Sequence, residues 1–102
     1  MNYIKSVAEF KEAIKEGLVM IDFYADWCGP CKMLSPIIED VANSYKDAAI
    51  YKLNVDNVGD VASALGIYSI PTIVFFKDGK EVNRNVGFTS KNVLISKLDA
   101  LK

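Results

Sequence analysis

The chain has 102 residues, the usual length of one domain, so we expect a single domain over residues 1–102 that buries about two-thirds of its unfolded surface. Its 12 basic and 13 acidic side chains nearly cancel, which argues against nucleic-acid binding. Its longest apolar run, residues 18–21, is too short to cross a membrane, and the absence of histidine excludes a Ser-His-Asp triad, a Cys-His pair and a His-rich metal site.

Helical and strand patterns alternate along the chain. Ser6 and Glu9 fit a capping box, Gly17 ends the helix that follows, and Pro36 is expected to kink the second helix. Asp78-Gly79 is a strong hairpin signal, and Ser90 fits the N-cap of a last helix. In order, we predict a helix from residue 7, a strand over 18–25, helix 30–45, strand 49–55, helix 59–65, strands 72–77 and 81–86, and a helix after residue 90.

This order predicts an α/β fold in which a central mixed sheet is flanked by helices on both faces. The strand over 18–25 is nearly continuous in apolar side chains, as expected of a strand covered on both faces. Sites in such sheets lie beyond the carboxyl ends of strands. The segment Trp27-Cys28-Gly29-Pro30-Cys31-Lys32, with both cysteines and the only tryptophan, follows this strand at that end.

A disulfide between two cysteines three positions apart contributes little to stability. Closing so small a ring stabilises a fold by only about 2 kcal/mol, against about 3 kcal/mol for a fifteen-residue loop. The two cysteines supply half the ligands of a structural zinc site, so we expect no metal. Cys28 falls at a predicted helix start, where backbone N–H groups favour the thiolate. We therefore expect Cys28 to attack a disulfide and Cys31 to resolve the mixed disulfide. The alternative is two thiols packed as small apolar groups.

Asp22 is an unusual residue for a strand covered on both faces, because burial of an unpaired carboxylate raises its pKa. Such a carboxyl could take the proton of Cys31 during resolution. The pattern equally fits a buried aspartate whose carboxylate is satisfied by hydrogen bonds or by a lysine such as Lys52. The local sequence does not decide the role of Trp27, which could shield a thiol, contact a partner or lie in the core. It does not decide the isomer of the Ile70-Pro71 peptide bond either, although most bonds before proline are trans.

Together these residues resemble the thioredoxin family, and the resemblance covers almost the whole chain. It rests on the strand with its acid, on Trp-Cys-Gly-Pro-Cys, and on the distant Ile-Pro-Thr, in the family's order and spacing. The matching segments are 20–25, 26–32, 52–56, 70–72, 76–79 and 86–87. The motif Cys-x-x-Cys alone would be far less specific.

The resemblance implies the thioredoxin fold and a general protein-disulfide reductase that carries two electrons to disulfides in other proteins. A thioredoxin reductase would recharge it with electrons from NADPH or ferredoxin, and no cofactor would be bound. The expected partners are that reductase and disulfide-containing proteins, with neither nucleic acid nor membrane. Because we find no signal peptide and only two cysteines, we expect a cytoplasmic location. We also expect a monomer.

The resemblance also implies roles for individual residues. Asp22 matches the family's buried acid near the resolving cysteine, Lys52 its lysine neighbour, and Pro71 a cis-proline beside the disulfide. The docking surface for target proteins would comprise Trp27, Gly29, Pro30, Ile70, Pro71, Val86 and Gly87, with Phe88 at its edge. Tyr24 and Phe88 depart from the common pattern, which has a second tryptophan and a small residue at these positions. We expect Phe88 to bias the choice of partner.

Two other functions fit parts of the pattern. A disulfide oxidant or isomerase would use the same two thiols, but such relatives usually carry a histidine between the cysteines, where this chain has Gly29-Pro30. A binding module of the same fold would serve a partner through its apolar surface, independently of Cys28 and Cys31. A variant that lacks both thiols separates this module from an oxidoreductase.

Overall fold

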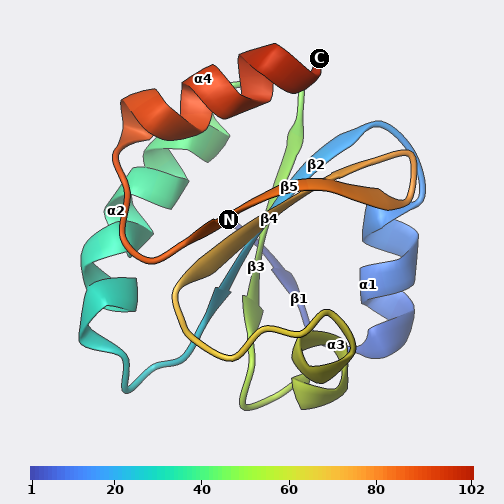
Figure 1. Ribbon diagram of the computed structural model, residues 1–102, viewed down its shortest axis with the longest axis vertical. Helices are drawn as coiled ribbons and strands as arrows, with labels where there is room; N and C mark the ends of the chain where they lie inside the picture. The colour runs from blue at the N-terminus through green and yellow to red at the C-terminus, as the bar shows by residue number, and fades with distance from the viewer.

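The chain winds helices around a five-stranded sheet, and the computed structural model describes all residues from 1 to 102 (Figure 1). The strands lie in the order β1-β3-β2-β4-β5. Pairs β1/β3 and β2/β3 are parallel, whereas β2/β4 and β4/β5 are antiparallel, so the sheet is mixed as predicted. The elements are β1 (Asn2–Ile4), α1 (Val7–Ile14), β2 (Leu18–Tyr24), α2 (Gly29–Ser44), β3 (Ala49–Asn54), α3 (Gly59–Ala64), β4 (Thr72–Lys77), β5 (Lys80–Val86) and α4 (Lys91–Leu101).

Helices cover both faces of the sheet, which confirms the predicted architecture. Helices α2 and α4 lie on one side in Figure 1, and α1 and α3 lie on the other. Alternate side chains of β2 point to opposite faces. Leu18 and Met20 pack with α2 and α4, whereas Val19, Ile21 and Phe23 pack with α1 and α3. By this alternation, Asp22 faces the side of the sheet that α2 covers.

The predicted helix signals hold in the structure. The Ser6 hydroxyl accepts a hydrogen bond from the backbone N–H of Glu9 at 3.1 Å, and the Ser90 hydroxyl accepts one from Val93 at 3.2 Å. Helix α2 runs through Pro36 from Gly29 to Ser44 without a break, so the kink stays a prediction. The starts of α1 and α4 therefore lie where the capping residues Ser6 and Ser90 predict.

The hairpin between β4 and β5 turns at Asp78 and Gly79, as predicted. Both residues have positive φ angles, of 50° and 88°, which a tight two-residue turn requires and which glycine adopts without strain. The Asp78 side chain also accepts a hydrogen bond from the backbone of Gly17, at 2.8 Å. This bond ties the hairpin to the loop before β2.

The prediction that a helix comes first is wrong, because β1 (Asn2–Ile4) precedes it. This edge strand has only three residues and pairs with β3 alone. Of its side chains only Ile4 is buried, so no alternation of apolar and polar residues marks the strand in the sequence. Its existence depends on the unpaired edge of β3, which lies about fifty residues further along the chain.

Candidate active site

Cys28 and Cys31 form a disulfide at the start of α2, shortly after the end of β2. Cys28 is the N-cap of α2, and its sulfur accepts a hydrogen bond from the backbone N–H of Cys31, at 3.2 Å. Pro30 lies in the first turn of the helix, where its missing N–H leaves no bond unmade. An N–H donor and the positive end of the helix dipole therefore both act on the Cys28 sulfur, and both favour its thiolate.

The disulfide is shielded from solvent. Cys28 and Cys31 are 5% and 2% exposed, and they pack with Ala25, Tyr24, Val55 and Ile70. The Sγ atom of Cys28 lies 3.8 Å from the carbonyl oxygen of Ile70. The bond from Ile70 to Pro71 is cis, as the family resemblance implied. The segment before β4 is thus in contact with the sulfur that is the expected nucleophile.

Asp22 is fully buried in β2, and neither carboxylate oxygen has a hydrogen-bond partner. Desolvation raises its pKa from 3.8 to about 7, although the positive charge of Lys52 acts in the opposite direction. No group of the protein therefore satisfies this carboxylate through a hydrogen bond. A carboxyl with a pKa near neutrality can both give and take a proton under ordinary conditions.

Lys52 is the direct neighbour of Asp22 across the parallel pair β2/β3, so both side chains point to the same face. Its ammonium group nevertheless donates to the hydroxyl of Ser35, at 2.7 Å, and lies 4.5 Å from the centre of the Tyr24 ring. The face of an aromatic ring attracts a cation. Ser35 and Tyr24 therefore bind the charge that would otherwise be free to pair with Asp22.

A hollow of about 350 Å³ leads from the surface to Cys31, Ser35 and Lys52. Cys31 and Ser35, which are four residues apart and so on one face of α2, form one wall, and Lys52 lies opposite on β3. The full lining is Tyr24, Ala25, Asp26, Cys31, Lys32, Ser35 and Lys52. Its size admits water, so solvent protons can reach the buried thiol.

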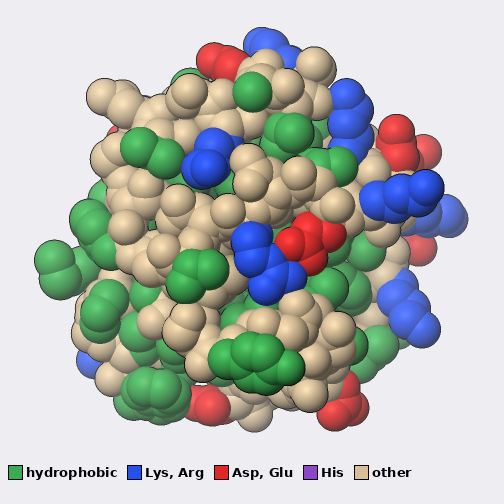
Figure 2. Space-filling view, in the orientation of Figure 1, with side chains coloured by type: hydrophobic (Ala, Val, Ile, Leu, Met, Phe, Trp, Pro, Cys, Tyr) green, Lys and Arg blue, Asp and Glu red, His purple; other side chains and the backbone are tan.

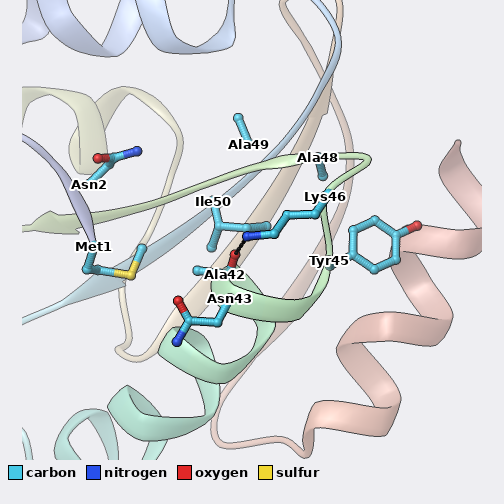
Figure 3. A pocket seen from close by; sticks show the side chains of 9 residues that line it. All are labelled: Met1, Asn2, Ala42, Asn43, Tyr45, Lys46, Ala48, Ala49 and Ile50. Atoms are coloured by element: carbon cyan, nitrogen blue, oxygen red, sulfur yellow. Dashed lines mark hydrogen bonds between the residues drawn. The ribbon is translucent and has the colours of Figure 1, made fainter.

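A second hollow, of about 260 Å³, lies at the opposite end of α2 (Figure 3). Lys46 is the only charged side chain around it, and its ammonium donates to the carbonyl of Ala42 at 3.5 Å. It has neither a thiol nor an acid, so it offers no groups for redox chemistry. The reactive side chains therefore gather at one end of the molecule.

Apolar side chains surround the disulfide on the outside. In Figure 2 they gather along the left and lower rim, over the loops beside α2 and α3, whereas mixed charges occupy the right. Trp27 is 71% exposed, so it belongs to this surface and not to the core. Its indole N–H donates to Asp56 at 2.9 Å, which fixes the ring against the end of β3. An exposed apolar surface of this kind suits transient protein contacts.

The chain brings together the segments that sequence reasoning placed on this surface. The backbone N–H of Gly87 donates to the carbonyl of Pro71 at 2.8 Å, and Val86 pairs with Thr72. Val86 and Phe88 are exposed, Ile70 and Gly87 are half-buried, and Pro71 is buried. Gly29 and Pro30 are exposed beside Trp27.

Sequence reasoning missed four residues that the structure places around the site. Ser35 could have been found from its helical spacing to Cys31, because residues four apart share a helix face. Asp56, Tyr68 and Arg84 carry no such local signal. Tyr68, which is 93% exposed, joins the surface only through the path of the loop after α3.

A mixed sheet with a helix that begins at a redox-active Cys-x-x-Cys pair, beside a cis-proline, defines a thiol-disulfide oxidoreductase. Comparisons with known proteins agree. A family model described as Thioredoxin matches residues 2–100. Thioredoxin-2 of Saccharomyces cerevisiae is 54% identical over 86 residues, which are 82% of this chain and 83% of that protein. Thioredoxin of Chlamydia muridarum is 46% identical over 93% of both chains.

Solved structures show the same similarity. A thioredoxin of Plasmodium falciparum superposes with a TM-score of 0.93 at 32% identity and covers 100% of both chains. A mutant thioredoxin of Halobacterium salinarum gives a TM-score of 0.91 at 38% identity, over 97% of this chain and 88% of that one. The chain belongs to the thioredoxin family, with the thioredoxin fold that the sequence predicts, and it is a protein-disulfide oxidoreductase. No helix of the structure is long and apolar enough to span a membrane.

Proposed function

We propose that Cys28 is the attacking thiol and Cys31 the resolving thiol of a general protein-disulfide reductase. The observation that carries this assignment is the hydrogen bond from the Cys31 backbone to the Cys28 sulfur at the N-cap of α2. It stabilises negative charge on one sulfur only. Cys31 lies one turn further into the helix, within reach of the first sulfur, with a Cα–Cα distance of 5.2 Å.

The exchange runs in two balanced steps. The Cys28 thiolate attacks one sulfur of the target disulfide, which forms a mixed disulfide and releases the other target sulfur as a thiolate. Cys31 then loses its proton and attacks Cys28, which breaks the mixed disulfide and releases the second target thiolate. The target has gained two electrons, and this protein is left with the Cys28–Cys31 disulfide.

Asp22 is the proton acceptor for Cys31 in the second step, directly or through water. Its ionised form takes the proton, and its protonated form returns one when the disulfide of this protein is reduced. A pKa of about 7 supports both directions, because neither form is rare near neutral pH. Lys52, held by Ser35, is close enough to lower that pKa without fixing the carboxylate in its ionised form.

The apolar surface around the disulfide receives the target protein. Trp27, Gly29 and Pro30 form its edge at the start of α2, and the backbone of Ile70 is placed to pair with an extended target segment beside Pro71. The remaining members are Val86, Gly87 and Phe88. Phe88 is half-exposed and bulky, so it favours some partners over others.

The same surface serves the partner that recharges the protein. We assign that role to a thioredoxin reductase, with electrons from NADPH or ferredoxin and no cofactor bound to this chain. The whole chain acts as one thioredoxin domain and as a monomer. Its use of only two cysteines, both at the site, favours the cytoplasm, where thiols are kept reduced.

The test is reduction of insulin by the protein with NADPH and thioredoxin reductase, or with a ferredoxin-linked reductase. Wild type should reduce insulin catalytically, and Cys28→Ser should have no activity. Cys31→Ser should accumulate a mixed disulfide with insulin, which a non-reducing gel and mass spectrometry detect. A trapped adduct on Cys31 in the Cys28→Ser variant would reverse the two roles, and inactivity of wild type with both reductases would overturn the proposal.

A further inference from the structure

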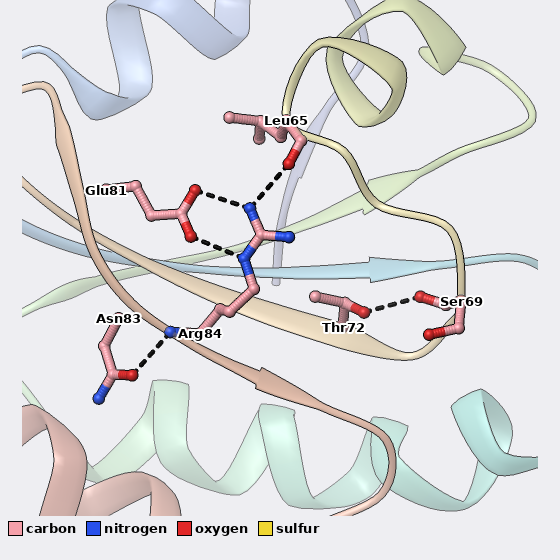
Figure 4. Close-up of polar contacts among 6 residues, drawn as sticks. All are labelled: Leu65, Ser69, Thr72, Glu81, Asn83 and Arg84. Carbon is pink, nitrogen blue, oxygen red and sulfur yellow. Dashed lines mark hydrogen bonds and ion pairs between the residues drawn. The ribbon is translucent and has the colours of Figure 1, made fainter.

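Arg84 connects strand β5 to the end of helix α3 (Figure 4). Its guanidinium binds both carboxylate oxygens of Glu81, at 2.6 and 2.8 Å, and the same group donates to the backbone carbonyl of Leu65, at 2.8 Å. A two-pronged pair of this kind fixes the plane of the guanidinium. The direction of the third hydrogen bond, toward Leu65, is therefore fixed as well.

A β-bulge makes this arrangement possible. Residues three apart in a regular strand point to opposite faces, so Glu81 and Arg84 should not meet. The register of β4 and β5 shifts between Phe75 and Phe76, which leaves Val82 as an extra residue on β5. The extra residue returns Glu81 and Arg84 to one face. Bulges often redirect side chains next to active sites, and they strengthen the local bend of the strand.

The carbonyl group that accepts from Arg84 belongs to Leu65, which lies between the end of α3 and the docking loop, residues 66–71. The loop is held at its other end too, because Thr72 donates to the carbonyl of Ser69 at 2.7 Å, also drawn in Figure 4. Gly87 donates to the carbonyl of Pro71, and the Ile70 carbonyl lies 3.8 Å from the Cys28 sulfur. Arg84 therefore fixes the entrance of a loop whose exit contacts the disulfide.

We propose that Arg84 is a positioning residue for target binding: through Leu65 it sets the path of the docking loop, and so the place of the Ile70 backbone beside Cys28. This inference rests on the proposed role of that backbone in pairing with a target segment. Arg84 touches neither sulfur, so its effect should be confined to disulfides that come with a polypeptide chain. A small disulfide needs only access to Cys28.

The experiment compares two disulfides with pre-reduced protein. Arg84→Gln should react with insulin about five-fold more slowly than wild type, because displacement of a binding group by a fraction of an ångström weakens orientation. Its rate with a small aromatic disulfide should stay at the wild-type value, and so should its reduction potential. Arg84→Lys keeps the positive charge but cannot form the two-pronged pair with Glu81, so it should recover part of the rate with insulin. Amide hydrogen exchange over residues 66–70 should accelerate in Arg84→Gln.

Lys77→Gln is the matched control, because the Lys77 ammonium donates to the carbonyl of Leu101, at the end of α4, over 2.8 Å. It removes the same kind of contact from the same hairpin, but the helix it holds does not lead to the site. It should change neither rate. Equal slowing of Arg84→Gln with both disulfides, or an unchanged rate with insulin, would overturn the inference. Failure of wild type itself with insulin would instead overturn the proposed function.

Discussion

Replacement of Asp22 by asparagine should stabilise the folded protein, and the gain should grow with pH. In the unfolded chain the carboxyl ionises above its ordinary pKa of 3.8, whereas burial keeps it protonated in the fold up to about pH 7. The folded state therefore binds more protons than the unfolded state between these values. Since stability falls with pH wherever the folded state binds more protons, Asp22 destabilises the fold progressively from about pH 4 to pH 7.

The size of the effect follows from the shift in pKa. A change from 3.8 to about 7 corresponds to about 4 kcal/mol in the free energy of unfolding once the carboxyl is ionised in both states. This is a large share of the roughly 5–15 kcal/mol by which domains are stable. Below pH 3.8 the carboxyl is protonated in both states, so the contribution vanishes. Asparagine has nearly the same shape and no charge, so it removes the pH-dependent term without leaving a cavity.

The assay is urea unfolding of the oxidised protein at pH 4, 5.5, 7 and 8.5, with wild type beside Asp22→Asn. The oxidised form keeps the two thiols from titrating. The two stabilities should be close at pH 4, and at pH 8.5 the variant should be more stable by up to about 4 kcal/mol. Asp26→Asn removes a negative charge from an exposed position close by and serves as the control. A difference between wild type and Asp22→Asn that is the same at every pH would refute the reasoning.

In the proposed exchange the same carboxyl takes the proton of Cys31, so Asp22→Asn should slow the attack of Cys31 on the mixed disulfide by about a hundred-fold, measured as release of target thiol in stopped flow; an unchanged rate would remove Asp22 from the mechanism. Ser35→Ala should lower the pKa of Asp22, because it releases the ammonium group that Ser35 binds. Carbon-13 NMR of the carboxyl measures this, and a midpoint at the wild-type pH would contradict it. Phe88→Ala should change the relative rates with several target proteins, and unchanged ratios would show that Phe88 selects no partner.

Most of the fold could be predicted because its signals are local. The Asp78-Gly79 turn needs positive φ angles, and Ser6 and Ser90 are caps whose bonds lie within one helical turn. The apolar run of β2 indicates burial on both faces by composition alone. Strand β1 was missed because three residues with one buried side chain carry no period, and only pairing with β3 makes them a strand.

The residues of the site also differ in whether their signals are local in the sequence. The reactive pair could be predicted because the helix start and both sulfurs lie within four consecutive residues. The Arg84 contacts could not, because they depend on an extra residue in β5 that is visible only as a shift of register against β4. The place of Trp27 was open for a similar reason: its partner, Asp56, lies in the turn after β3, which is distant in sequence.

The environment of Asp22 depends on three elements together. The register of β2 and β3 sets an acid beside a base, and from that pairing alone a buried salt bridge would be expected. A closed ion pair would hold the carboxyl in its ionised form, which cannot return a proton to Cys31. Because Ser35 on α2 binds the ammonium of Lys52, the acid stays unpaired, and its pKa stays near 7. In the proposed exchange, the stability that an unpaired buried acid costs is therefore tied directly to its transfer of a proton from Cys31.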